Sequence, residues 1–226
     1  MKLLKSAQVQ TLALTEDDLE QINRHTLRAF NADELYAFKL LMCDNEIDRD
    51  EERFTVDALQ GLAKLYLGKT VIRDHVPSSA NQTARIYSTE VVQDAERKTS
   101  LGEPYTALVS KAYMVRTDSN ADLIKEIEAG IKKEVSVGCI IHRLSCSVCG
   151  NTPGKCRHLP GRTYDGVYCH TLLNDPKDAY EVSFVAVPSQ RNAGTTKNHE
   201  DDPEDRTKDI ALNDVFLFLQ NQRKDD

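Results

Sequence analysis

One stretch of the sequence gathers side chains that ligate metals. Of the six cysteines, Cys43 stands alone and the other five lie between residues 139 and 169. Part of that stretch follows the spacing C-x2-C-x6-C-x-H, formed by Cys146, Cys149, Cys156 and His158. A C-x2-C pair places two thiolates on one tetrahedral zinc ion, and a nearby pair of Cys or His side chains completes the shell. The spacing therefore predicts bound zinc.

The fourth ligand has two candidates, His158 and Cys169. His158 is favoured because a single residue separates it from Cys156, whereas Cys169 lies further along the chain. A shell closed by protein ligands leaves no position for a reacting water, so we expect a structural zinc. The segment 145–170 is too small and polar to fold by packing alone, and metal binding would stabilise it. A set of unligated thiols is the alternative interpretation.

A second group of residues could perform acyl transfer. The segments 133–138 (KEVSVG) and 180–185 (YEVSFV) share a strand-like pattern with a central serine. In the first of them Gly138 follows Ser136 by two residues and permits close approach of a bound peptide backbone. His75 ends a short strand-like segment and could accept a proton from a serine hydroxyl. Spacing alone does not join His75 to Ser136, and both residues also fit purely structural roles.

The surrounding pattern predicts the elements that must position these residues. Apolar residues at helical spacing, with capping residues such as Thr15 and Thr55, indicate helices near 16–23, 56–67 and 120–129. Apolar runs and alternation indicate strands at 35–43, 71–75, 84–92, 105–115, 135–141 and 180–187. These elements predict an α+β protein in which strands dominate.

Composition limits the classes of function. The chain has 226 residues, 40% of them hydrophobic, and a formal net charge of −7, which argues against nucleic acid as the main partner. No apolar run approaches the ~18 residues of a membrane span. Polar residues interrupt any leader-like stretch at the N-terminus, so we expect an intracellular protein with reduced thiols. We divide the chain into an N-terminal helical segment (1–32), a main domain (33–190) and a charged linker and tail (191–226).

The order of six motifs resembles one known family. The prohead (capsid maturation) serine proteases of tailed bacteriophages are similar to this chain at CDNEIDRDEERF (43–54), GKTVIRDH (68–75), ARIYSTEVV (84–92), GIKKEVSVGC (130–139), CSVCG…CRHLPGRTYDG (146–166) and YEVSFVAVPSQRNAG (180–194). The family itself is similar to herpesvirus assemblin. The resemblance implies a mostly antiparallel β-barrel flanked by helices, with the zinc knuckle (145–170) as an insert.

The resemblance also implies catalytic roles. Ser136 is the expected nucleophile, His75 the general base and Glu181 the carboxylate that orients the histidine. Glu134 is an alternative carboxylate, because residues two apart on a strand share a face and Glu134 is two residues from Ser136. Asp74 ranks last as the orienting carboxylate, because it is adjacent to His75 and adjacent side chains on a strand point to opposite faces. Cys139, the rival nucleophile, is expected to be a core thiol.

By the same resemblance the expected function is endopeptidase activity during viral assembly. The expected substrates are scaffold protein, major capsid protein and the protease itself, cleaved inside an immature capsid in the host cytoplasm where the protease self-associates. A non-enzymatic zinc-containing assembly or binding module is the alternative. Zinc-finger recognition of nucleic acid has little support, because the chain is acidic and no recognition helix follows the cysteines. Cleavage-site preference and removal of the tail stay open.

Overall fold

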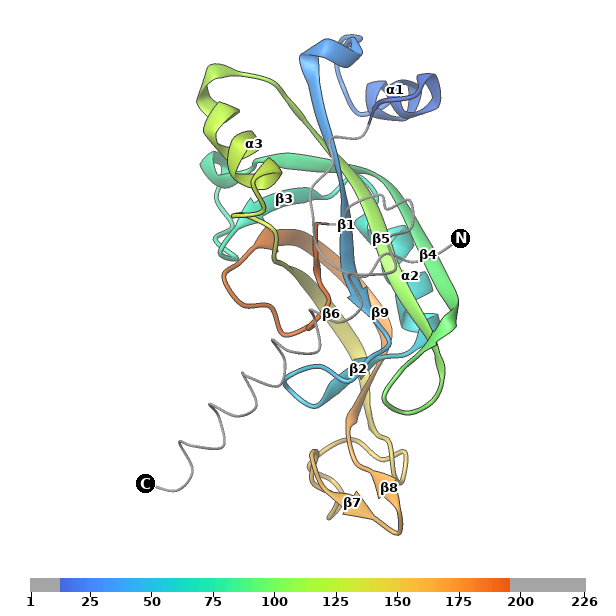
Figure 1. Ribbon diagram of the computed structural model, residues 1–226. Helices are drawn as coiled ribbons and strands as arrows, with labels where there is room; N and C mark the ends of the chain where they lie inside the picture. Colours follow the sequence, from blue (N-terminus) through green and yellow to red (C-terminus); the bar gives the residue numbers. More distant parts are fainter. Residues whose placement is uncertain (1–12, 196–226) are drawn as a thin grey trace.

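Strands dominate the computed structural model, which describes residues 13–195 and has an α+β fold (Figure 1). The helices are α1 (Glu16–Asn23), α2 (Val56–Tyr66) and α3 (Ala121–Glu128). The strands are β1 (Leu35–Asp44), β2 (Glu52–Phe54), β3 (Thr70–Arg73), β4 (Ala84–Lys98), β5 (Pro104–Val115), β6 (Val135–Cys146), β7 (Thr163–Tyr164), β8 (Val167–Tyr168), β9 (Thr171–Phe184) and β10 (Gly194–Thr195). The predicted helices and strands are thus present, and several strands are longer than expected.

One large sheet carries most of the chain. Its strand order is β10-β1-β5-β4-β3-β9-β2, and β6 pairs with β9 beside this path. Strands β1, β5 and β4 form an antiparallel series, whereas β9 pairs in parallel with both β3 and β2 and antiparallel with β6. Strand β9 therefore connects the end of β3, where His75 follows, to the strand that carries Ser136.

The sheet is not closed into a barrel, which corrects the expected fold. Within residues 13–195 no backbone ladder joins β6 to β1, and Glu134, just before β6, forms a single bridge with Gly194 of β10, which pairs with β1. Farther along, a pocket of about 340 Å³ separates Met42 of β1 from the side of β6 that carries Val137 and Cys139.

Helix α2 covers the core side of the sheet. Thr55 caps the helix by accepting a hydrogen bond from the backbone N–H of Ala58, and Leu59 and Leu62 are fully buried. After the helix, Gly68 adopts a left-handed conformation with φ of +78°, which L side chains rarely adopt. The chain thereby turns directly into β3, which places His75 beside β9.

Helix α1 packs on the sheet through Ile22 and is also joined to it by one buried carboxylate. Thr15 and Asp18 form a capping box, as the sequence around Thr15 suggests. Asp18 also accepts hydrogen bonds from the hydroxyl of Tyr87 at 3.1 Å and from Nζ of Lys111 at 2.8 Å. This network fixes α1 at the end of the molecule that also carries α3 (Figure 1).

A small polar insert connects β6 to β9. Its short strands β7 and β8 pair with each other, and the insert projects from the molecule at the end away from α1 and α3 (Figure 1). This connection corresponds to the predicted knuckle at 145–170. The predicted tail lies outside the described residues from 196 onward. Among the helices of residues 13–195, none has the length and apolar character needed to cross a membrane.

Candidate active site and metal centre

His75 and Glu181 form a hydrogen-bonded pair on the outer face of the sheet. Nδ1 of His75 lies 2.7 Å from Oε1 of Glu181. The Glu181 side chain is 11% exposed and the His75 side chain 44%, so the acid is shielded while the imidazole faces solvent. With Nδ1 engaged by the carboxylate, Nε2 is left available to accept a proton.

A buried serine fixes the geometry of this pair. Ser183 is fully buried, and its Oγ accepts a hydrogen bond from the backbone N–H of His75 at 3.0 Å. The same hydroxyl donates to Oε2 of Glu181 at 2.5 Å. Asp74 and His75 both have positive φ, 55° and 54°, a conformation that costs energy in non-glycine residues and concentrates at functional sites. The chain leaves β3 through this strained turn and folds His75 back onto β9.

Ser136 lies on the same face of the sheet as Glu181. In the antiparallel pair of β6 and β9, Ser136 is directly opposite Ser183, and Gly138 is directly opposite Glu181. Cα atoms so paired lie about 4.5–5.5 Å apart. Within the described part of the chain no hydrogen bond joins Ser136 to His75, but both contact the same short segment of β9. Strand β9 thus brings Glu181 into contact with His75 and lies in register with Ser136, while His75 and Ser136 are related to each other through β9.

Gly138 makes room for the carboxylate. A Cβ atom added at Gly138 would lie 2.2 Å from Oε1 of Glu181, the oxygen that binds His75. The close backbone approach predicted at Gly138 therefore serves the protein's own glutamate, and the glutamate lies across the β6 backbone two residues after Ser136.

We expect Gly138→Ala to destabilise the protein by about 1–3 kcal/mol, because the added methyl group forces Glu181 away from His75. Chemical denaturation measures the change in unfolding free energy. The penalty should be smaller when Gly138→Ala is made in a Glu181→Ala background, where no carboxylate opposes the methyl group. An equal penalty in both backgrounds would show that the clash is not with Glu181.

The other candidates from the sequence lie elsewhere. Glu134 pairs with Lys133 at 3.5 Å rather than with the histidine. Cys139 packs against the hydrophobic core, and burial raises the pKa of its thiol to about 11, which disfavours the nucleophilic thiolate. Ser183 is a site residue to which sequence reasoning assigned no role, although the shared EVS pattern of the two segments contained the signal.

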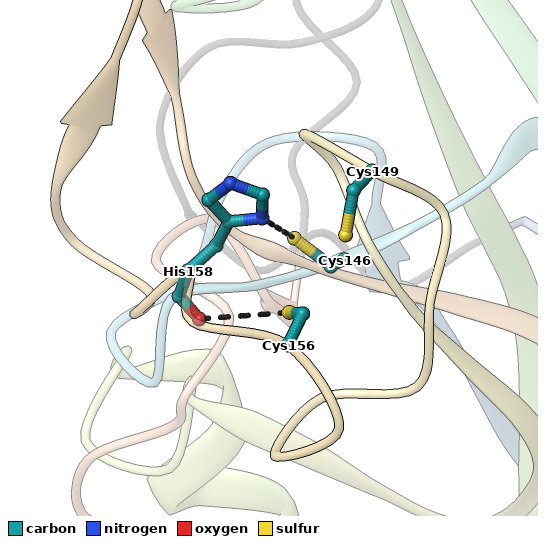
Figure 2. Close-up of side chains that lie close together, drawn as sticks. All are labelled: Cys146, Cys149, Cys156 and His158. Carbon is teal, nitrogen blue, oxygen red and sulfur yellow. Dashed lines mark hydrogen bonds between the residues drawn. The ribbon is translucent and has the colours of Figure 1, made fainter.

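The predicted metal ligands converge in the insert. The ligand atoms of four side chains all lie within 4.8 Å of one another: Cys146, Cys149, Cys156 and His158 (Figure 2). Sγ of Cys146 is 3.8 Å from Nδ1 of His158. Thiolates bound to one tetrahedral zinc at ~2.3 Å lie about 3.8 Å apart, so the cluster needs only small adjustments to close around an ion. The set can hold a metal, and its donors are those that zinc prefers.

Cys169 lies beside this set. Its Sγ is 3.8 Å from Sγ of Cys146, and the residue is buried, but it does not belong to the mutually close group of four. Tyr164 holds His158 in place. The two rings meet edge-on with their centroids 4.7 Å apart, and the Tyr164 hydroxyl accepts a hydrogen bond from the backbone N–H of Leu159. Geometry therefore favours His158 as the fourth ligand.

The thiol of Cys146 is prepared for ligation. Burial opposes its ionisation, but backbone N–H groups of Cys149 and Val148, with neighbouring thiols, outweigh burial and lower the pKa of Cys146 to about 6. A thiolate is the form that binds metal. No residue between 147 and 168 is buried, so the insert has no hydrophobic core of its own. Its compact shape requires another source of stability, which a bound ion would supply.

Comparison of this chain with protein-family models, with curated proteins and with solved structures finds no match.

Proposed function

We propose that this protein is a serine endopeptidase of the prohead-protease type. The observation that supports the proposal is the hydrogen bond between His75 and Glu181, on the same sheet face and beside the same strand segment as Ser136. The motif resemblance supplies the biological setting: cleavage of scaffold protein, major capsid protein and the protease itself inside an immature capsid in the host cytoplasm. On this proposal the strand-dominated sheet is a version of the assemblin-type barrel with an open seam.

The reaction would proceed by acyl transfer. Nε2 of His75 takes the proton of the Ser136 hydroxyl as Oγ attacks a substrate carbonyl carbon. Glu181 holds the proton on Nδ1 and stabilises the imidazolium that forms. The imidazolium then gives its proton to the leaving amine, and a water molecule hydrolyses the acyl-enzyme by the same proton transfers in reverse order. Ser183 acts through Glu181 and is a positioning residue.

The metal in this proposal is a structural zinc. Cys146, Cys149, Cys156 and His158 would hold it, with Cys169 as the neighbouring thiol. Zinc bound there stabilises the insert by crosslinking a segment without a core of its own. The competing function is a zinc-containing assembly module in which Ser136 and His75 only pack. Two observations favour it: the four potential zinc ligands lie close together, and within residues 13–195 no hydrogen bond joins Ser136 to His75.

A fluorophosphonate probe separates the two functions. We expect the probe to label Ser136, because only a serine activated by a neighbouring base reacts rapidly with it. Peptide mapping by mass spectrometry locates the label. Ser136→Ala should abolish labelling, His75→Ala should slow it by at least about a hundredfold, and Ser88→Ala, a partly exposed serine on β4, should leave it unchanged.

The labelling is measured on the full chain, both alone and co-assembled with capsid and scaffold proteins. Labelling of Ser136 in either state supports the endopeptidase. An assembled particle in which Ser136 stays unlabelled contradicts it and favours the assembly module.

A further inference from the structure

A pocket borders β6 at Ser136. The pocket of about 340 Å³ lies between β1, β2 and β6, and Ser136, Val137 and Cys139 form one of its walls. Met42 and Phe54 contribute apolar surface from the other strands. A pocket of this volume accommodates one long side chain. The proposed nucleophile therefore has a side-chain-sized cavity directly beside it.

Three carboxylates belong to the lining of this pocket. Asp48, Asp50 and Glu52 all contribute to the lining. Asp48 is buried and engaged by the backbone N–H groups of Asp50 and Glu52. The side chains of Asp50 and Glu52, in contrast, make no hydrogen bond or ion pair with any residue from 13 to 195. Burial raises the pKa of Glu52, and the charges of Asp48 and Asp50 raise it further.

These charges have no cationic partner in the described part of the chain, and they do not converge as metal ligands do. In residues 13–195 the Cys/His set of the insert is the group of potential ligands that lies close enough to hold an ion. Spread carboxylates over apolar walls fit a different occupant, a long aliphatic stem that ends in a cation. Lysine and arginine side chains have this chemistry.

A polypeptide can reach the pocket along β6. Within residues 13–195, β9 is the strand that pairs with β6. On the other edge, Glu134 forms a bridge with Gly194 and the backbone N–H of Val135 donates to the carbonyl of Ala193, so that edge is free of strand pairing from Ser136 onward. An unpaired strand edge offers backbone donors and acceptors to an added extended peptide, and such a peptide places alternate side chains on one face. A peptide bound there would run past Ser136 with one side chain entering the cavity.

We infer that the pocket receives a lysine or arginine side chain of an extended polypeptide substrate, next to the bond that Ser136 attacks. The inference rests on the proposed endopeptidase function and defines its substrate class. Glu52 and Asp50 determine the specificity, since they are the carboxylates free to pair with the cation.

The test measures binding, so that it does not depend on turnover. Fluorescein-labelled alanine-rich hexapeptides carry lysine, norleucine or glutamate at one central position, and fluorescence anisotropy reports their binding to the full-length Ser136→Ala variant. We expect lysine to bind at least about tenfold more tightly than norleucine, which has the same aliphatic length without the charge, and glutamate to bind weakest. Glu52→Gln and Asp50→Asn, introduced together, should reduce the lysine preference to less than about threefold.

Glu96→Gln is the matched control, because it removes one exposed negative charge outside the pocket lining. It should leave the lysine preference intact. Equal binding of lysine and norleucine peptides, or no binding of any peptide, overturns the pocket assignment. If no lysine preference is found but fluorophosphonate still labels Ser136, the pocket assignment is overturned and the endopeptidase function stands. If lysine peptides bind selectively but Ser136 is not labelled, the endopeptidase function is overturned and the cation preference of the pocket stands.

Discussion

Glu181→Gln should slow acylation of Ser136 about 10⁴-fold. Ser183 donates its only hydroxyl proton to one carboxylate oxygen at 2.5 Å, so the amide oxygen of a glutamine should take that position. The amide NH₂ group then faces Nδ1 of His75, where the carboxylate oxygen is now 2.7 Å away. Because an N–H donates, Nδ1 has to accept and the ring proton moves to Nε2. An imidazole protonated at Nε2 cannot take the proton from Ser136.

The second-order rate of fluorophosphonate labelling and the rate of peptide cleavage both report this loss. Glu134→Gln is the matched control: it removes the same charge two residues before Ser136, and we expect it to change either rate by less than about threefold, since Glu134 pairs with Lys133. Circular dichroism establishes that both variants are folded. A large loss of rate in Glu134→Gln, with normal rates in Glu181→Gln, would show that Glu134 and not Glu181 orients His75.

If the insert holds the proposed zinc, removal of that ion should unfold the insert and leave the sheet intact. Metal binding contributes roughly 10 kcal/mol or more to the folding of small zinc modules, and this insert buries no residue between 147 and 168 to replace that contribution. Proteolysis within the insert should therefore accelerate by several orders of magnitude after equilibration with a strong chelator. Ser136 should still be labelled, because about ten residues of β6, roughly 30 Å of strand, separate it from Cys146.

Two cysteine variants make this test specific. Cys149→Ser removes a member of the close cluster and should reduce bound zinc, measured by elemental analysis, from one ion per chain to near none. Cys169→Ser, at the neighbouring thiol, should retain the ion if His158 is the fourth ligand. Zinc loss in Cys169→Ser with retention in His158→Ala would reverse that assignment. Loss of Ser136 labelling on chelation with an unchanged fold would instead point to a metal used in catalysis.

Much of the fold follows from local patterns in the sequence. Thr15 and Thr55 begin helices as their capping chemistry predicts, and the regular alternation after Tyr105 belongs to β5. The close approach of Cys146, Cys149, Cys156 and His158 was equally predictable, because these residues lie near one another in sequence at a spacing typical of metal ligands. Local information of this kind does not depend on how distant segments pair.

The open seam and the hydrogen bonds of the candidate site were not predictable from such patterns. Whether β6 reaches β1 depends on side chains from both strands and on the pocket between them, which no single segment specifies. Likewise, the role of Ser183 depends on the left-handed turn at Asp74 and His75, which brings a backbone N–H to its hydroxyl. Aspartate and histidine adopt positive φ more readily than most residues other than glycine, but neither requires it, so their identities did not specify that turn. The choice of Glu181 over Glu134 was left open for the same reason.

The pairing of β6 with β9 also divides the chain by its tolerance of added or deleted residues. Between Ser136 and Glu181, inserting one residue in either strand would turn Ser136 and Glu181 towards opposite faces of the sheet. At the far end of the same hairpin, Gly154 is exposed, and a Cβ atom added there would meet nothing within 4 Å. Relatives of this protein can therefore differ in length at the tip of the hairpin, or accept a foreign domain there, while the spacing from Ser136 to Cys139 and from Glu181 to Ser183 stays constant.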